Sequence, residues 1–136
     1  MMELGIKIAF NAPKEKIWEH YVDKEKRVLW EEDLEDLQYD AEIKTGTTGR
    51  MKLKGRPAMD FVLSKIIENE VYYDMYSIPN AGTFYFCHDI TEEDGQLFVK
   101  HSICSDEDNE IALNVLTEIF SDFPKVLWKF KEVVEA

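Results

Sequence analysis

With 136 residues, the chain is long enough for one domain, 1–136, that buries roughly two thirds of the surface its unfolded chain exposes, and its two cysteines are too few for a disulfide framework. The formal net charge of −12 at pH 7 argues against nucleic acid or an anionic membrane as a partner, because both are polyanions that repel carboxylates. No apolar run reaches the length that spans a bilayer, and the N-terminus lacks the pattern of a secretory signal, so we expect no membrane insertion and a cytoplasmic location.

The beginning of the chain predicts a strand. Ile6, Ile8 and Phe10 alternate with Lys7 and with small residues, which is the period of a strand that is buried on one face. We therefore expect a strand over residues 4–11.

Two short helices follow in the prediction. Asn11 can cap a helix and Pro13 fits its first turn, so the first helix is expected over 14–21. Asp23 is the expected cap of the second helix, over 24–30. These two helices would close one end of a sheet.

The middle of the chain predicts strands separated by turns, with no helix among them. The strand over 37–43 is the candidate edge strand, so pairing with a second chain in a homodimer stays an open alternative. Cys87 and Cys104 fall inside strands and are expected to be reduced. The expected strands cover 37–43, 50–54, 58–67, 71–78, 83–91 and 96–104.

The last hairpin of the prediction brings two histidines together. Asp94-Gly95 is the strongest short hairpin signal in the sequence. A two-residue loop there places His88 directly across from His101, and a loop longer by two residues keeps both on one face, whereas a three-residue loop separates them. The same face carries the apolar residues Phe84, Phe86, Ile90, Leu97, Val99 and Ile103.

The end of the chain, 105–135, predicts one long amphipathic helix. Its apolar stripe consists of Ala112, Leu116, Ile119, Phe123, Leu127, Phe130 and Val134. Strands followed by a closing helix predict an α+β fold in which a curved antiparallel sheet grips the helix. Such an arrangement can leave a cavity between the sheet and the helix.

Two imidazoles on an apolar face can orient a ligand, transfer protons or bind a metal. Two histidines supply only half of a zinc shell, and no further ligand has suitable spacing, so we expect no metal and no cofactor. Nor does the sequence place a carboxylate that would orient either ring, and catalytic residues stay unassigned. Asp60, Asp74 and Asp89 are the nearby candidates if their faces allow it.

Both ends of the chain resemble a known superfamily. Residues 8–18, with Asp23-Lys24-Glu25 and Trp30 after them, resemble the first strand and helix pair of START-like proteins, also called Bet v 1-like or SRPBCC proteins. Residues 123–135 are similar to the closing helix of the branch of Hsp90 ATPase activator homologues: an aromatic residue, Pro, then Leu, Leu and Lys at helical spacing, and a terminal Glu. The chain departs from the family by lacking a Pro-Pro near residues 68–69.

The resemblance implies the helix-grip fold, with seven antiparallel strands, two short helices after the first strand and a long C-terminal helix. It also implies a hydrophobic small molecule, such as a lipid or a polyketide, bound between sheet and helix. A cyclase or dehydratase that uses the same cavity and an Hsp90-type co-chaperone with a chaperone partner are the alternatives. The expected ligand-binding residues are Trp30, Met59, Phe61, Tyr76, Phe86, His88, His101, Ile119 and Phe123.

Overall fold

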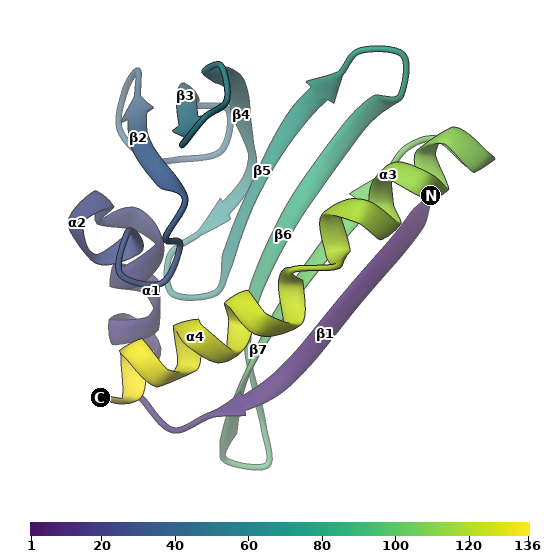
Figure 1. The fold of residues 1–136 in the computed structure, drawn as a ribbon. Coiled ribbons are helices and arrows are strands. Elements are labelled where there is room, and N and C mark those ends of the chain that lie inside the picture. The colour runs from purple at the N-terminus through teal and green to yellow at the C-terminus, as the bar shows by residue number, and fades with distance from the viewer.

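The computed structural model describes all residues, 1–136, and its centre is one seven-stranded antiparallel sheet. Along the sheet the strands follow the order β1-β7-β6-β5-β4-β3-β2, so β1 and β2 are its two edges (Figure 1). The strand expected at an edge is therefore an edge strand. The strands are β1 (Met2–Phe10), β2 (Leu34–Tyr39), β3 (Thr48–Leu53), β4 (Met59–Ile67), β5 (Val71–Ile78), β6 (Gly82–Glu93) and β7 (Gln96–Ser105).

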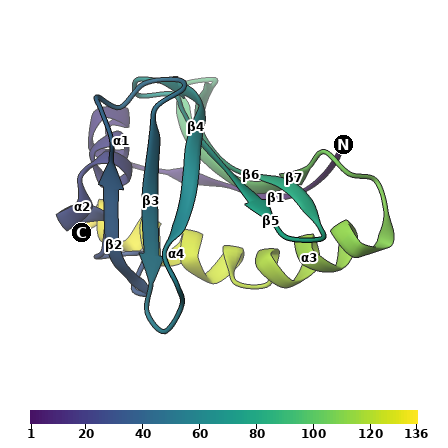
Figure 2. The ribbon, with the colours of Figure 1, turned by 90° about the horizontal axis from the view of Figure 1, so that it is seen from above.

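The sheet bends around the C-terminal helices. Figure 2 shows β2, β3 and β4 standing at a steep angle to the remaining strands, with the last two helices crossing the concave side. This is the α+β helix-grip arrangement that the sequence predicts. The helices are α1 (Lys14–Val22), α2 (Lys24–Arg27), α3 (Glu110–Phe120) and α4 (Phe123–Glu135). None of them combines the length and the apolar character that a bilayer-crossing helix needs.

The closing segment is two helices, where the sequence predicts one. α3 ends at Phe120 and α4 begins at Phe123, so Ser121 and Asp122 form a break that is visible in Figure 1. Pro124 lies in the first turn of α4, where its missing N–H costs nothing, whereas inside a continuous helix it would remove a hydrogen bond. The predicted stripe still faces the sheet across the break, and its buried members are Ala112, Leu116, Leu127, Phe130 and Val134.

The first two helices differ from the prediction at their ends. Pro13, and not Asn11, is the N-cap of α1 and makes no side-chain capping bond, so the predicted Asn11 cap is wrong. The Asp23 cap is confirmed, since its carboxylate accepts hydrogen bonds from the backbone N–H groups of Glu25 and Lys26. α2 ends at Arg27 because the next residues form tighter turns, in which the N–H of Trp30 reaches back only to the Arg27 carbonyl oxygen.

β2 lies earlier in the sequence than the strand predicted over 37–43. Its ladder with β3 begins at Leu34 opposite Leu53 and ends at Tyr39 opposite Gly49. Residues 40–47 are then needed for the connection back to β3 and cannot extend the strand.

The final hairpin has the predicted register. Asp94 and Gly95 both adopt positive φ angles, 52° and 82°, as a two-residue hairpin turn of the favoured kind requires. His88 is therefore paired with His101. Their face of the sheet is the one covered by α4, and both rings are buried there.

Candidate ligand-binding site

The two histidines form a neutral, buried pair. Their ring centroids are 4.7 Å apart, and the planes are almost perpendicular at 83°. His88 Nδ1 donates to the carbonyl oxygen of Tyr72 at 2.7 Å, and His101 Nε2 shares a hydrogen bond of 2.8 Å with the Tyr21 hydroxyl. Burial, with the nearby Arg27 cation, lowers the pKa of His88 to about 3, and burial beside His88 puts the pKa of His101 well below its usual value.

Aromatic side chains enclose this pair on the helix side. The Phe130 ring of α4 stacks on His101 with centroids 5.6 Å apart, and Tyr21 lies 5.0 Å from His88. Trp30 packs on Phe130 at 4.4 Å and donates its indole N–H to the carbonyl oxygen of His20. Three of the predicted site residues, Trp30, His88 and His101, thus belong to a closely packed part of the core.

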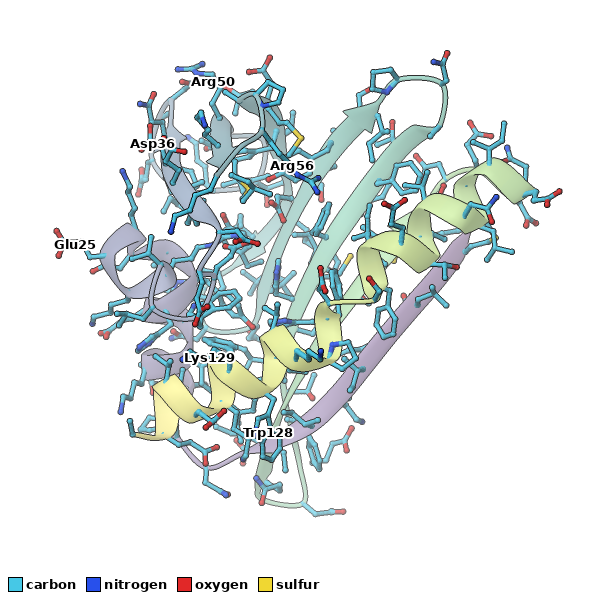
Figure 3. The ribbon with its side chains drawn as sticks, in the orientation of Figure 1. Glu25, Asp36, Arg50, Arg56, Trp128 and Lys129 are labelled. Atoms are coloured by element: carbon cyan, nitrogen blue, oxygen red, sulfur yellow. The ribbon has the colours of Figure 1, made fainter.

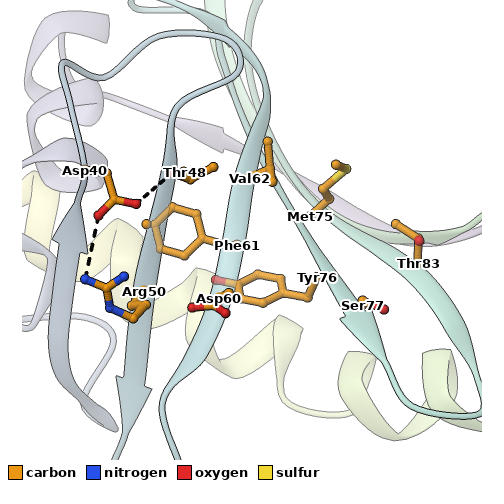
Figure 4. Close-up of a pocket in the computed structure, with 11 residues that line it drawn as sticks. Asp40, Thr48, Arg50, Asp60, Phe61, Val62, Met75, Tyr76, Ser77 and Thr83 are labelled. Carbon is orange, nitrogen blue, oxygen red and sulfur yellow. Dashed lines mark hydrogen bonds and ion pairs between the residues drawn. The ribbon is translucent and has the colours of Figure 1, made fainter.

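An open cleft lies elsewhere, where β4 and β5 separate. Their ladder begins at Val62 opposite Met75, and the strand ends beyond this pair diverge, as Figure 4 shows. The cleft has a volume of about 480 Å³. The rings of Phe61 and Tyr76, 5.9 Å apart and buried, form its floor. The lining consists of Asp40, Thr48, Gly49, Arg50, Asp60, Phe61, Val62, Met75, Tyr76, Ser77 and Thr83.

Charged and polar groups surround the mouth of the cleft. Asp40 forms an ion pair with Arg50 at 3.7 Å and accepts a hydrogen bond of 2.6 Å from the Thr48 hydroxyl (Figure 4). Gly49 allows the Phe61 ring to lie directly against β3, because a Cβ atom at this position would collide with that ring and with a backbone carbonyl oxygen of β2. The cleft therefore has an apolar floor and a polar rim.

An aromatic row continues from the cleft towards the helices. Tyr76 packs on Phe86 with ring centroids 5.3 Å apart, and Phe86 packs on Phe123 at 6.1 Å. Phe86 and Phe123 are only partly buried. Together with Phe61 these residues form one continuous aromatic wall, defined here as Phe61, Tyr76, Phe86 and Phe123. The structure thus brings four of the predicted site residues together.

Of the aromatic wall, only Phe61 and Tyr76 line the cleft, and the two remaining predicted site residues also lie outside its lining. Met59, at the start of β4, is 39% exposed. Ile119, on α3, packs on the small core cluster under that helix, as Phe123 also does.

A buried polar network lies behind the aromatic wall, and its main cation is Arg27. This side chain is 2% exposed, donates from Nε to Glu31 at 2.7 Å and from Nη1 to the Tyr72 hydroxyl at 3.0 Å. The Tyr72 and Tyr39 hydroxyls share a further hydrogen bond of 2.7 Å. The sequence does not predict Arg27 as part of a buried network, because its only signal is Glu31, a carboxylate one helical turn later.

Asp74 belongs to the same buried layer. It is 1% exposed, and its Oδ2 accepts a hydrogen bond of 2.8 Å from the Tyr76 hydroxyl. Its Oδ1 has no hydrogen-bond partner. Burial raises the pKa of Asp74 to about 6, although the Arg27 cation opposes this shift. The sequence names Asp74 as a candidate carboxylate, and the alternation along β5 places it between the buried Tyr72 and Tyr76.

No protein-family model and no curated protein matches the chain. Among solved structures, the Aha1 dimer from Colwellia psychrerythraea has a TM-score of 0.75 at 16% identity, over 99% of this chain and 97% of that one. Ara h 8.0201 has a TM-score of 0.71 at 12% identity, over 98% and 97%. DynU16, from the dynemicin biosynthetic locus, has a TM-score of 0.74 at 11% identity, over 98% of this chain and 47% of that one.

The chain has the helix-grip fold of the START-like, or Bet v 1-like, superfamily. The START-like fold predicted from both ends of the sequence is thus confirmed. Identities this low establish the fold alone, so the function is argued from the site of this chain.

The buried titratable groups of this chain predict how its stability depends on pH. Both histidines have folded pKa values below the unfolded value of 6.5, so the stability they contribute above pH 6.5 is lost as the pH falls. Asp74 has the opposite sign: its pKa of about 6 exceeds the unfolded value of 3.8, so its protonation favours the folded state as the pH falls. Each proton by which the unfolded and folded states differ changes the free energy of unfolding by about 1.4 kcal/mol per pH unit.

We expect the free energy of unfolding, measured in urea, to fall by about 1.4 kcal/mol for each pH unit between pH 7 and pH 5, which corresponds to a net uptake of about one proton on unfolding. His101→Gln removes one histidine proton and should make the dependence nearly flat, whereas Asp74→Asn should make it steeper. Identical slopes for the parent chain and both variants would contradict the neutral, buried state of these groups.

Proposed function

We propose that this chain binds a small, largely apolar molecule in the cleft between β4 and β5, against the Phe61 and Tyr76 rings of the aromatic wall. The observation that carries the proposal is the cleft itself, about 480 Å³ in volume with the Phe61 and Tyr76 rings as its floor. Ligand pockets are typically concave and mostly apolar, with a few polar groups and volumes of roughly 300–1,000 Å³. The polar rim and the apolar floor support this assignment.

Affinity would come mainly from apolar burial. Each Å² of ligand surface removed from water contributes about 25 cal/mol, and aromatic rings offer large, rigid surfaces for contact. The rim groups Asp40, Arg50 and Asp60 would set the orientation of a polar ligand end. The acidic surface of the chain favours neutral or cationic ligands over anions.

The proposed site is displaced from the one expected between the histidine pair and the closing helix. His88, His101 and Trp30 lie in the packed layer next to α4, and we assign them a structural role in that layer and not ligand contact. Phe61 and Tyr76, the two members of the aromatic wall that line the cleft, are the proposed contact residues.

A neutral fluorophore, N-phenyl-1-naphthylamine, tests the proposal by fluorescence titration. We expect saturable binding to the parent chain. Ser77→Trp places an indole in the cleft lining and should weaken binding about tenfold or more. Thr91→Trp is the matched control, since Thr91 is an exposed strand residue on β6 outside the cleft lining, and it should leave the affinity unchanged. Equal affinities for the two variants, or no binding to the parent, would refute the proposal.

A further inference from the structure

The outer face of the sheet carries both cysteines of the chain. His88 and His101 lie on the face that α4 covers, and strand alternation places Cys87 and Cys104 on the opposite face. α3 and α4 cross the concave side of the sheet, as Figure 2 shows, so neither helix covers the two thiols.

The two thiols are neighbours although they are not opposed in the ladder. Cys87 is paired with Ser102, and Cys104 is paired with Tyr85, so the cysteines occupy diagonal positions on β6 and β7. Their Sγ atoms lie 3.9 Å apart. The spacing along the sequence gives no sign of this contact, because it arises only from the register of the hairpin.

The separation of the sulphurs favours metal coordination over a disulfide. A disulfide has an S–S length of about 2.05 Å, so the two Sγ atoms would have to approach to about half their present separation. Metal ions bind thiolate sulphur at about 2.3 Å, so one ion between the two Sγ atoms reaches both of them where they lie. The pair is therefore spaced as two ligands of a single ion.

The number of ligands selects the class of ion. No group of three or more His, Cys, Asp or Glu side chains is arranged to hold a metal ion. Structural zinc needs four ligands, and calcium and magnesium need several oxygen ligands, so these ions do not suit the site. Cu(I) is a soft ion that prefers thiolate sulphur, and two thiolates satisfy it.

Charged side chains at the surface border the thiol pair. Lys100 pairs with Glu3 at 2.7 Å and acts on Cys104 electrostatically, so its cation would stabilise the negative charge of two thiolates with one Cu(I). Glu3 accepts a hydrogen bond from Cys104 at 3.4 Å, and Asp89 acts on Cys87. Lys100 and Glu3 are both more than one third exposed, so they can move aside to admit an ion. The formal charge of −12 attracts cations to the chain.

We propose that Cys87 and Cys104 form a two-thiolate binding site for Cu(I) on the outer face of the sheet. Each thiol releases its proton to solvent as its sulphur binds, and the ion keeps its oxidation state, so no electron is transferred. Neither cysteine lines the cleft between β4 and β5, and the inference is independent of the proposed function.

Competition with bicinchoninate, a chelator that forms a coloured complex with Cu(I), tests this site under anaerobic conditions. We expect the reduced chain to remove one Cu(I) ion per chain from the chelator, measured as loss of the colour. X-ray absorption at the copper edge on this complex should show two sulphur ligands.

Cys87→Ser and Cys104→Ser each leave a single thiolate. Each should lower the affinity for Cu(I) more than about a hundredfold, which exceeds the 10–100-fold loss typical of removing an outer partner of a metal ligand. Met59→Leu is the control, because it removes an exposed thioether sulphur from another strand, and it should leave the affinity unchanged. Circular dichroism of the variants establishes that each is folded.

The inference would be overturned if the copper stayed with the chelator, or if both serine variants removed it as well as the parent does. Nitrogen ligands in place of the two sulphurs would overturn it on the parent chain alone, whether or not the variants fold. None of these results bears on the binding of an apolar molecule in the cleft, which is measured with the fluorophore.

Discussion

Replacing Phe130 by alanine is expected to lower the free energy of unfolding by about 3–5 kcal/mol. The Phe130 ring is fully buried on α4 and contacts the rings of Phe10, His20, Tyr21, Trp30 and His101. Its removal leaves a cavity in the layer that joins α4 to the sheet and to α1, and neighbours held by strands and helices cannot collapse to fill it.

Trp128→Ala is the matched control for Phe130→Ala. Trp128 lies two residues earlier on the same helix but is 55% exposed, and Figure 3 shows its side chain on the outer side of α4. Its truncation should cost less than about 0.5 kcal/mol. Urea unfolding followed by circular dichroism measures both variants. Similar losses would mean that α4 is held by something other than the aromatic layer.

The second large effect is expected for Arg27→Met, which should cost about 3 kcal/mol. The substitution keeps an apolar stem of similar length but removes the partner of Glu31 and the donor to the Tyr72 hydroxyl. Glu31 is 24% exposed and recovers part of its hydration, which places the loss at the low end of the range for buried ion pairs.

Lys24→Met is the control for Arg27→Met, because Lys24 pairs with Asp36 on the surface, where both side chains are more than one third exposed. Exposed pairs contribute about 0–1 kcal/mol. The double variant Arg27→Met/Glu31→Leu should regain part of the stability, since it removes the unpaired carboxylate as well. If Lys24→Met were as costly as Arg27→Met, burial would not be the cause.

The final hairpin was predictable because its register depends on local chemistry. Asp94 and Gly95 accept the positive φ angles of a two-residue turn, and this fixes His88 opposite His101. The closing stripe was predictable for a similar reason, since helical spacing alone places Leu127 and Phe130 on one side.

The cleft was not predictable in the same way. It exists because β4 and β5 stop pairing at Val62 and Met75, which follows from the bend of the whole sheet and from no local pattern. The burial of Trp30 also depends on long-range packing, because a tryptophan beside a loop suits a cavity mouth and a core equally well.

The surroundings of Asp74 could be predicted only in part. The alternation along β5 places its side chain on the inner face of the sheet, but it cannot reveal that one carboxylate oxygen lacks a hydrogen-bond partner.

The most direct test of the binding account is a titration of N-phenyl-1-naphthylamine into the ¹⁵N-labelled chain, followed by amide chemical shifts. The account predicts saturable shifts centred on the cleft, at Phe61, Met75, Tyr76 and Ser77. Shifts confined to the exposed apolar residues Ile111 and Leu113 of α3, or no saturable shifts at all, would contradict it.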